Sequence, residues 1–201
     1  MRTFSFRLMF SVLMFITLVS QNVQAESSSP NIVNHETEGN LEVTHQIGCV
    51  GFSELSNKYT PADLYHGFAQ CLRDENYEIG SQLFVLAGVY ATFDKLRVAD
   101  GSAHQAHTVL LMRAMEGVPK DRKDRMMEAL NGALTKGSAK LTETCQTVRK
   151  IGAPDYFPGY MIQHGIKAFT GPQANRGLIP EFKKESAWEE SLAGYLHCSA
   201  K

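Results

Sequence analysis

The sequence predicts an all-α protein, a single compact bundle of about six or seven helices with a flexible N-terminal tail and two disulfides. Apolar residues recur every three or four positions in several segments, as in helices with one buried face. Residues typical of helix starts and stops bound these segments, and no convincing pair of strands is present. An even number of cysteines in an exported chain adds the disulfides.

Residues 1–25 have the layout of a cleaved secretory signal peptide. Arg2 and Arg7 precede the mainly apolar run Leu8–Val19, and Val23 and Ala25 place small side chains before the cleavage point. The run is too short to span a bilayer, which takes ~20 apolar residues, although an uncleaved anchor is the alternative interpretation. We therefore expect a periplasmic or secreted protein without stable membrane insertion after cleavage.

The remaining chain divides into a flexible tail, residues 26–45, and a single helical domain, residues 46–201. The formal charge of the full chain is −1 at pH 7, and no basic block is present. Nucleic-acid binding needs clustered Lys and Arg, so this class of partner is excluded, as is electrostatic docking on anionic lipid. The densest basic run, residues 120–125, is interleaved with aspartates.

The four cysteines are Cys49, Cys71, Cys145 and Cys198. Disulfides persist outside the cytoplasm, so we expect two, with three possible connectivities. Pairing of neighbours, Cys49 with Cys71 and Cys145 with Cys198, is the preferred one. The spacings do not suit a zinc site, and an oxidised cysteine cannot act as a nucleophile, so no metal or cofactor is expected.

The first two helices are predicted from their start signals and their apolar residues. Thr60 and Asp63 form a capping pair around Pro61, and an apolar stripe repeats every four residues from Leu64. A second helix, residues 78–96, is apolar on every side at its centre, which indicates the central helix of the bundle.

Three further helices follow in the middle of the chain. Ser102 and Gln105 form a possible capping box for a helix that ends near residue 116. Gly137 would end the next helix, residues 120–136, whose inward side chains we expect to be Met126, Met127, Leu130 and Leu134. Ser138 begins another, which places Leu141, Cys145 and Val148 on one face and stops at Gly152.

Residues 154–180 are rich in Gly, Pro and aromatic residues, and only a short helix around residues 160–169 is expected there. A last helix covers residues 186–197, with Trp188, Leu192 and Tyr195 inward. Aromatic residues in a Gly/Pro-rich loop supply adaptable contact area, although they could equally cap the end of the bundle. The predicted binding surface consists of Tyr156, Phe157, Tyr160, His164 and Phe169.

Residues 62–88 resemble one helical hairpin of the tetratricopeptide type. The positions that match its large, tyrosine, small, aromatic and small residues are Leu64, Tyr77, Gly80, Phe84 and Ala87. Phe68 departs from the pattern, which has a small residue there, and no second copy follows. The resemblance implies the packing of a helix hairpin and a protein-binding function.

His104 and His107 are the candidate catalytic residues because they lie three positions apart on one helix face, shortly after Asp94 and Asp100. Two histidines and a carboxylate can hold a metal or perform acid–base chemistry. The alternative is that His107 is a hydrogen-bonded core residue, because it shares its face with Ala103 and other apolar residues. The HExxH arrangement is absent.

These observations predict an exported, non-catalytic domain that binds another protein of the envelope, for example to neutralise a toxin or an enzyme. The alternative is a cell-wall-directed hydrolase or metal-binding protein that uses His104 and His107. The two differ in a visible way. A binding protein carries an exposed apolar patch, whereas an enzyme brings titratable groups together in a concave site.

Overall fold

The computed structural model describes residues 36–199, and within this range the protein is all-α, without a β-strand. Three short 3-10 helices, η1 (Gly101–Gln105), η2 (Ile166–Phe169) and η3 (Ala174–Gly177), connect the α-helices. The α-helices are α1 (Pro61–Arg73), α2 (Tyr77–Arg97), α3 (Ala106–Ala114), α4 (Lys120–Leu134), α5 (Ala139–Ile151), α6 (Gly159–Ile162) and α7 (Lys184–Leu196). The predicted fold class is confirmed.

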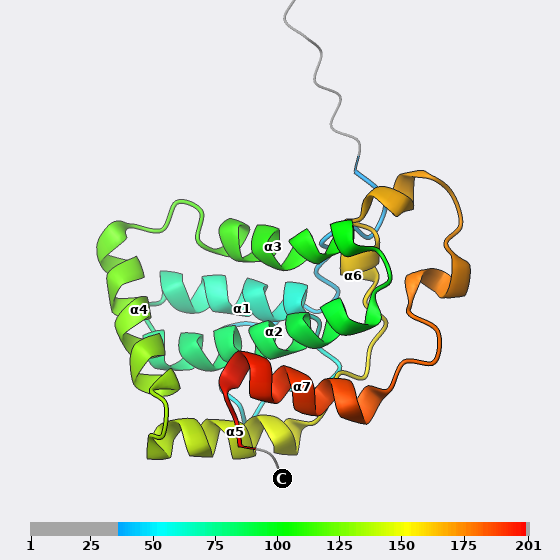
Figure 1. Ribbon diagram of the computed structural model, residues 1–201. Coiled ribbons are helices and arrows are strands. Elements are labelled where there is room, and N and C mark those ends of the chain that lie inside the picture. The colour runs from blue at the N-terminus through cyan, green and yellow to red at the C-terminus, as the bar shows by residue number, and fades with distance from the viewer. Residues whose placement is uncertain (1–35, 200–201) are drawn as a thin grey trace, which may run out of the picture. The chain divides into compact units, whose positions relative to one another are not determined.

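Helix α2 is the centre of the bundle, as its apolar sequence predicts. The helix has 21 residues, and its buried side chains include Leu83, Leu86, Val89 and Phe93. Helix α1 lies antiparallel beside it, α3 covers α1, and α7 packs on the other side of α2 (Figure 1). Helix α4 crosses the ends of these helices and leads into α5.

The start signals of α1 and α5 act as predicted. The Thr60 side chain accepts a hydrogen bond from the Asp63 backbone N–H, and the Asp63 carboxylate accepts one from Thr60 N–H. Ser138 likewise accepts from Leu141 N–H at the start of α5, which ends at Gly152 with φ +94°. Local hydrogen bonding therefore sets these boundaries.

Three predictions for the middle of the chain are wrong. Helix α4 ends at Leu134 with Thr135 as its C-cap, so Gly137 does not end it. The expected capping box of Ser102 and Gln105 does not form, because Asp100 accepts the Ser102 N–H and the chain first winds as a 3-10 helix. Met127 is 52% exposed rather than buried. Helix α4 buries only a narrow stripe, with Met126 and Leu130 in contact with the core, so the adjacent position faces solvent.

The two disulfides join Cys49 to Cys71 and Cys145 to Cys198, which confirms the predicted pairing of neighbours. The first ties the segment 36–60 to α1, and the second ties α5 to Cys198, two residues after the end of α7. Both ends of the described chain are therefore covalently attached to the helical body.

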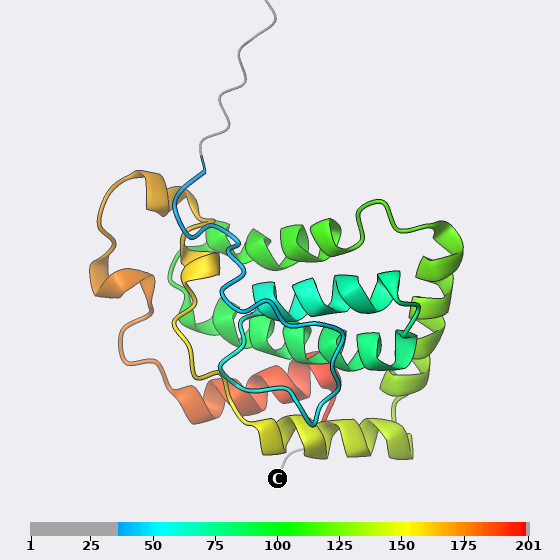
Figure 2. The same ribbon diagram turned by 180° about the vertical axis from the view of Figure 1, so that it is seen from behind.

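The segment 36–60 runs without helices across the face of α1 and α2 that lies opposite α7 (Figure 2). The backbone N–H groups of Thr44 and His45 donate to the buried carboxylate of Asp63 at 2.7 and 2.8 Å. The Leu41 side chain is buried as well. Residues 36–45, part of the predicted tail, thus pack on the body, and the rest of the tail lies outside the described residues.

The predicted signal peptide, residues 1–25, also lies outside the described residues. Among residues 36–199, no helix combines the length and the apolar character needed to cross a membrane.

Candidate functional site

Residues 166–179 form a loop that stands out from the helical body (Figure 1). Its first end is hydrogen bonded to the segment after α2: Ile166 N–H donates to the Ser102 hydroxyl and Lys167 N–H to the Asp100 carboxylate, both at 2.9 Å. Burial alone would raise the pKa of Asp100, but hydrogen bonds from Ser102 and Lys167 outweigh it, and the pKa is lowered. A Cβ atom at Gly165 would lie 2.4 Å from the Asp100 carboxylate, so glycine is needed for this close approach.

The second end of the loop is held by the same short segment. Ala99 N–H donates to the Gly177 carbonyl and Ile179 N–H to the Arg97 carbonyl, each at 2.9 Å. An isolated antiparallel bridge pairs Val98 with Leu178 between these bonds. Because both ends meet at residues 97–102, the loop has the closed form of an Ω-loop and is anchored rather than free.

The tip of the loop contains two consecutive residues in a conformation that side chains disfavour. Asn175 and Arg176 have φ of +49° and +54°, in the left-handed region. Such a conformation costs ~1 kcal/mol or more for a residue other than glycine. The Asn175 amide donates to the Leu178 carbonyl at 3.1 Å, which supports the turn. Backbone strain held at an exposed site is often connected with function.

Exposed apolar side chains gather on this part of the chain. Among the described residues, six large hydrophobic side chains are exposed, and four of them belong to residues 157–179. Ile166 and Phe169, 69% and 54% exposed, lie three positions apart in η2, where 3-10 geometry places them on one side. We call the four side chains the apolar loop surface: Phe157, Ile166, Phe169 and Ile179.

Two cations accompany the apolar loop surface. The Arg176 guanidinium lies 4.4 Å from the centroid of the Phe157 ring, and Lys167 follows Ile166 directly. Residues 156–180 contain no Asp or Glu. The predicted binding surface omitted Ile166 and Ile179. The absence of acidic residues from this whole stretch is the sequence signal that could have extended the predicted surface to include them.

The structure divides the five residues of that predicted surface. Phe157 and Phe169 are exposed. Tyr160 is only 4% exposed, so its inclusion in a binding surface is wrong: its hydroxyl points into the core. Tyr156 is partly buried and makes a similar bond. His164 Nδ1 lies 2.9 Å from the Asn40 side-chain oxygen, a contact with the segment 36–60.

Asp94 is the core residue that both tyrosines contact. The Tyr156 and Tyr160 hydroxyls donate to the same oxygen of its carboxylate, each at 2.9 Å, and Arg97 pairs with the other oxygen at 2.7 Å. The Arg97 guanidinium lies about 5 Å from the rings of Phe93 and Tyr156. Burial raises the pKa of Asp94, while Arg97 and the two hydroxyls oppose this shift. The arrangement joins α2 to the segment around α6.

The candidate catalytic histidines have separate partners. His104 Nε2 lies 3.1 Å from the Val98 carbonyl oxygen. His107 Nε2 lies 2.8 Å from the Tyr65 hydroxyl, and its Nδ1 lies 3.3 Å from the Lys95 ammonium. Burial, and then the charge of Lys95, lower the pKa of His107 from 6.5 to about 4, so the ring is neutral at pH 7.

A neutral His107 has one donor and one acceptor nitrogen. The Lys95 ammonium can only donate, so Nδ1 accepts and Nε2–H donates to the Tyr65 oxygen. Both ring nitrogens are thus used in packing contacts. Within residues 36–199, no group of three or more His, Cys, Asp or Glu side chains is placed to hold a metal ion. This geometry fits the interpretation of His107 as a hydrogen-bonded core residue.

Comparisons of the chain with protein-family models, with curated proteins and with solved structures find no match.

Proposed function

We propose that the protein is an exported, non-catalytic binding protein that holds another protein of the envelope through its apolar loop surface. The observation that carries this proposal is the concentration of exposed apolar side chains on one anchored loop and at Phe157, whose ring lies against Arg176 of that loop. Apolar side chains gathered at the surface are typical of sites of protein contact. An anchored loop loses little conformational freedom on binding, which favours affinity.

The compartment is part of the proposal. Two disulfides are typical of proteins that work outside the cytoplasm, and residues 1–25 have the sequence of a signal peptide. The two observations together support a periplasmic or secreted location. The surface is then available to envelope components and to secreted toxins or enzymes.

The charges beside the loop specify the chemistry of the partner. Lys167 and Arg176 lie among the apolar side chains, and no acidic residue occurs between positions 156 and 180. A protein surface that combines apolar side chains with Asp or Glu complements this loop, since unlike charges favour the correct encounter and disfavour basic surfaces. We do not propose the hydrolase, because both candidate histidines contact structural partners.

Site-specific photo-crosslinking in the native cells tests this function. A photoreactive phenylalanine replaces Phe169 in one variant and Met127 in a control, because these side chains are similarly exposed, 54% and 52%. Position 169 should give one discrete crosslinked protein, and position 127 should not. Adding Lys167→Glu and Arg176→Glu to the first variant should remove the adduct. No adduct at 169, or the same adducts at both positions, contradicts the proposal.

A further inference from the structure

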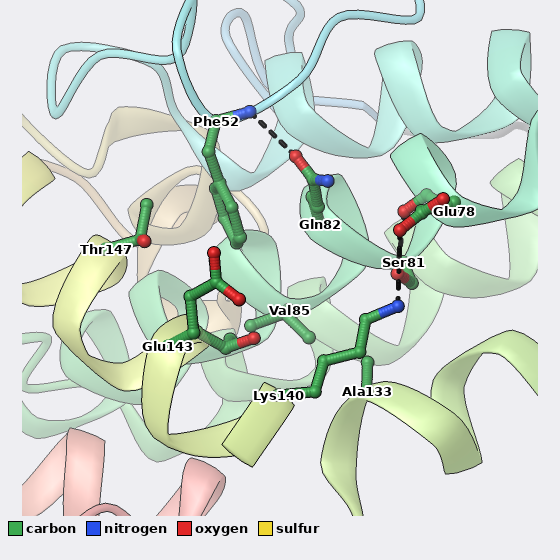
Figure 3. Close-up of a pocket in the computed structure, with 10 residues that line it drawn as sticks. Phe52, Glu78, Ser81, Gln82, Val85, Ala133, Lys140, Glu143 and Thr147 are labelled. Carbon is green, nitrogen blue, oxygen red and sulfur yellow. Dashed lines mark hydrogen bonds and ion pairs between the residues drawn. The ribbon is translucent and has the colours of Figure 1, made fainter.

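Two lysines of the protein, Lys140 and Lys95, have contrasting surroundings. Lys140 lines a pocket between α2, α4, α5 and the segment 36–60 (Figure 3). Its Nζ lies 3.3 Å from a Glu78 carboxylate oxygen, and both side chains are exposed. Glu143 lines the same pocket and is exposed as well. The charges of this pocket are therefore solvated, and the Lys140 ammonium is held in an ordinary surface ion pair.

Lys95, on α2, makes no ion pair with a carboxylate anywhere in the range 36–199. Its Nζ lies 3.3 Å from His107 Nδ1 on α3, and His107 Nε2 lies 2.8 Å from the Tyr65 hydroxyl on α1. The His107 and Tyr65 rings are stacked, with their centroids 5.8 Å apart. Side chains from three helices therefore place the Lys95 amine against a neutral imidazole and not against a negative charge.

This environment favours the uncharged form of the Lys95 amine. A neighbouring carboxylate would stabilise the ammonium form, whereas burial disfavours it. The Lys95 side chain is partly buried, and burial lowers its pKa below the ordinary value. Only the unprotonated amine is a nucleophile, so Lys95 should react with electrophiles faster than a solvated lysine does. The side chain is also partly exposed, so a small molecule can reach it.

We propose that Lys95 is a site at which small aliphatic aldehydes bind covalently, as a Schiff base. The amine lone pair attacks the carbonyl carbon, and the resulting carbinolamine loses water as the C=N bond forms. The two amine hydrogens and the carbonyl oxygen leave as that water, with solvent carrying the protons, so the step needs no oxidant. Lys95 and its two partners lie outside the apolar loop surface, and the two proposals can fail separately.

Reductive trapping of the disulfide-bonded protein with butanal tests the site. Sodium cyanoborohydride reduces a Schiff base to a stable secondary amine, and mass spectrometry of proteolytic fragments then gives the rate of modification at each lysine. At pH 7, Lys95 should be modified about tenfold faster than Lys123, or more. Lys123 is the matched control because, among the lysines of residues 36–199, only these two are partly buried.

Two substitutions of His107 separate the effect of charge from that of packing. His107→Glu places a carboxylate beside Lys95 and should slow its modification by about tenfold, because an ion pair holds the ammonium form. His107→Gln keeps a neutral acceptor and should leave Lys95 faster than Lys123. Equal rates for the Glu and Gln variants, both folded by circular dichroism, would overturn the proposal. If the Glu variant does not fold, the unsubstituted protein decides, since equal rates at Lys95 and Lys123 there also overturn it.

Discussion

Asp94 is a buried charge whose partners come from two distant parts of the sequence. Arg97 is its neighbour on α2, while Tyr156 and Tyr160 lie 62 and 66 positions away. Arg97 and the two tyrosine hydroxyls all bind the Asp94 carboxylate, which is inaccessible to solvent. Removal of the carboxylate leaves the Arg97 charge and two hydroxyls without an acceptor, which costs more than the loss of an exposed ion pair.

We expect Asp94→Ala to lower the free energy of unfolding by ~3–5 kcal/mol, the usual effect of breaking a buried charge pair. Urea unfolding followed by circular dichroism measures this difference. Asp155→Ala is the control because Asp155 is exposed and lies next to Tyr156. If Asp94→Ala lowers the free energy of unfolding by less than ~1 kcal/mol, the Asp94–Arg97 ion pair contributes no more to stability than an exposed pair does.

His107 makes stability depend on pH. Its pKa is about 4 in the folded protein and near 6.5 in an unfolded chain, so the unfolded state binds the proton more tightly. The stabilisation is complete above pH ~6.5 and is lost as pH falls toward 4, by up to ~3 kcal/mol. Urea unfolding between pH 7 and 4.5 should show this loss. It should become smaller in His107→Gln but not in His66→Gln, a change at an exposed residue.

At the scale of the elements, the close approach of α2 and α7 depends on one glycine. A Cβ atom added at Gly88 would lie 2.0 Å from the Tyr195 ring, so the ring occupies the space that a larger residue would need. Gly132, in α4, has no atom near the equivalent position. The same substitution therefore has opposite consequences in the two helices.

Gly88→Ala should destabilise the protein by ~1–3 kcal/mol, because the Tyr195 ring must move out of a packed interface. Gly132→Ala should stabilise it by up to ~1 kcal/mol, because alanine is a better helix former and meets no obstacle. Thermal unfolding of the two variants compares these effects. If both substitutions stabilise the protein, Tyr195 has another position available to it.

The helices could be predicted because their signals are local. Thr60 and Ser138 act within three residues, and the all-round apolar centre of α2 indicates burial without knowledge of its neighbours. Met127 was mispredicted because the width of a buried stripe depends on what the helix packs against, and α4 crosses other helices only at their ends.

The sites depend on contacts between distant segments, which no local pattern contains. Phe157 and Phe169 of the predicted binding surface are exposed, but the burial of Tyr160 could be predicted only with knowledge of its contact with Asp94. The pocket beside Glu143 was not predicted at all. Its walls come from α2, α4, α5 and the segment before α1, and the residues have no common spacing.

At the scale of the whole molecule, two disulfides fasten the ends of the described chain to the bundle. The Cys49–Cys71 bridge spans 22 positions and the Cys145–Cys198 bridge spans 53. A bridge that closes a longer loop restricts the unfolded chain more strongly. The anchored loop and α7 lie between Cys145 and Cys198 in the sequence, so the proposed binding region belongs to the stretch of chain that the second bridge closes.

Replacement of Cys145 and Cys198 by alanine should lower stability by ~4 kcal/mol, and replacement of Cys49 and Cys71 by ~3 kcal/mol. Urea unfolding gives both values, with the unsubstituted protein as reference. Amide hydrogen exchange should accelerate in α7 when Cys145 and Cys198 are replaced. It should accelerate in the segment 36–60 when Cys49 and Cys71 are replaced. The assignment of these roles fails if the two double variants lose protection in the same helices.

The enclosed loop has a consequence for proteolysis. Residues 168–176 lie between Cys145 and Cys198, and hydrogen bonds to residues 97–102 hold both sides of any cut. An extracellular protease that nicks this exposed tip would produce two polypeptides that stay covalently joined. The nicked protein would migrate as one species on a non-reducing gel and separate into two fragments only after reduction.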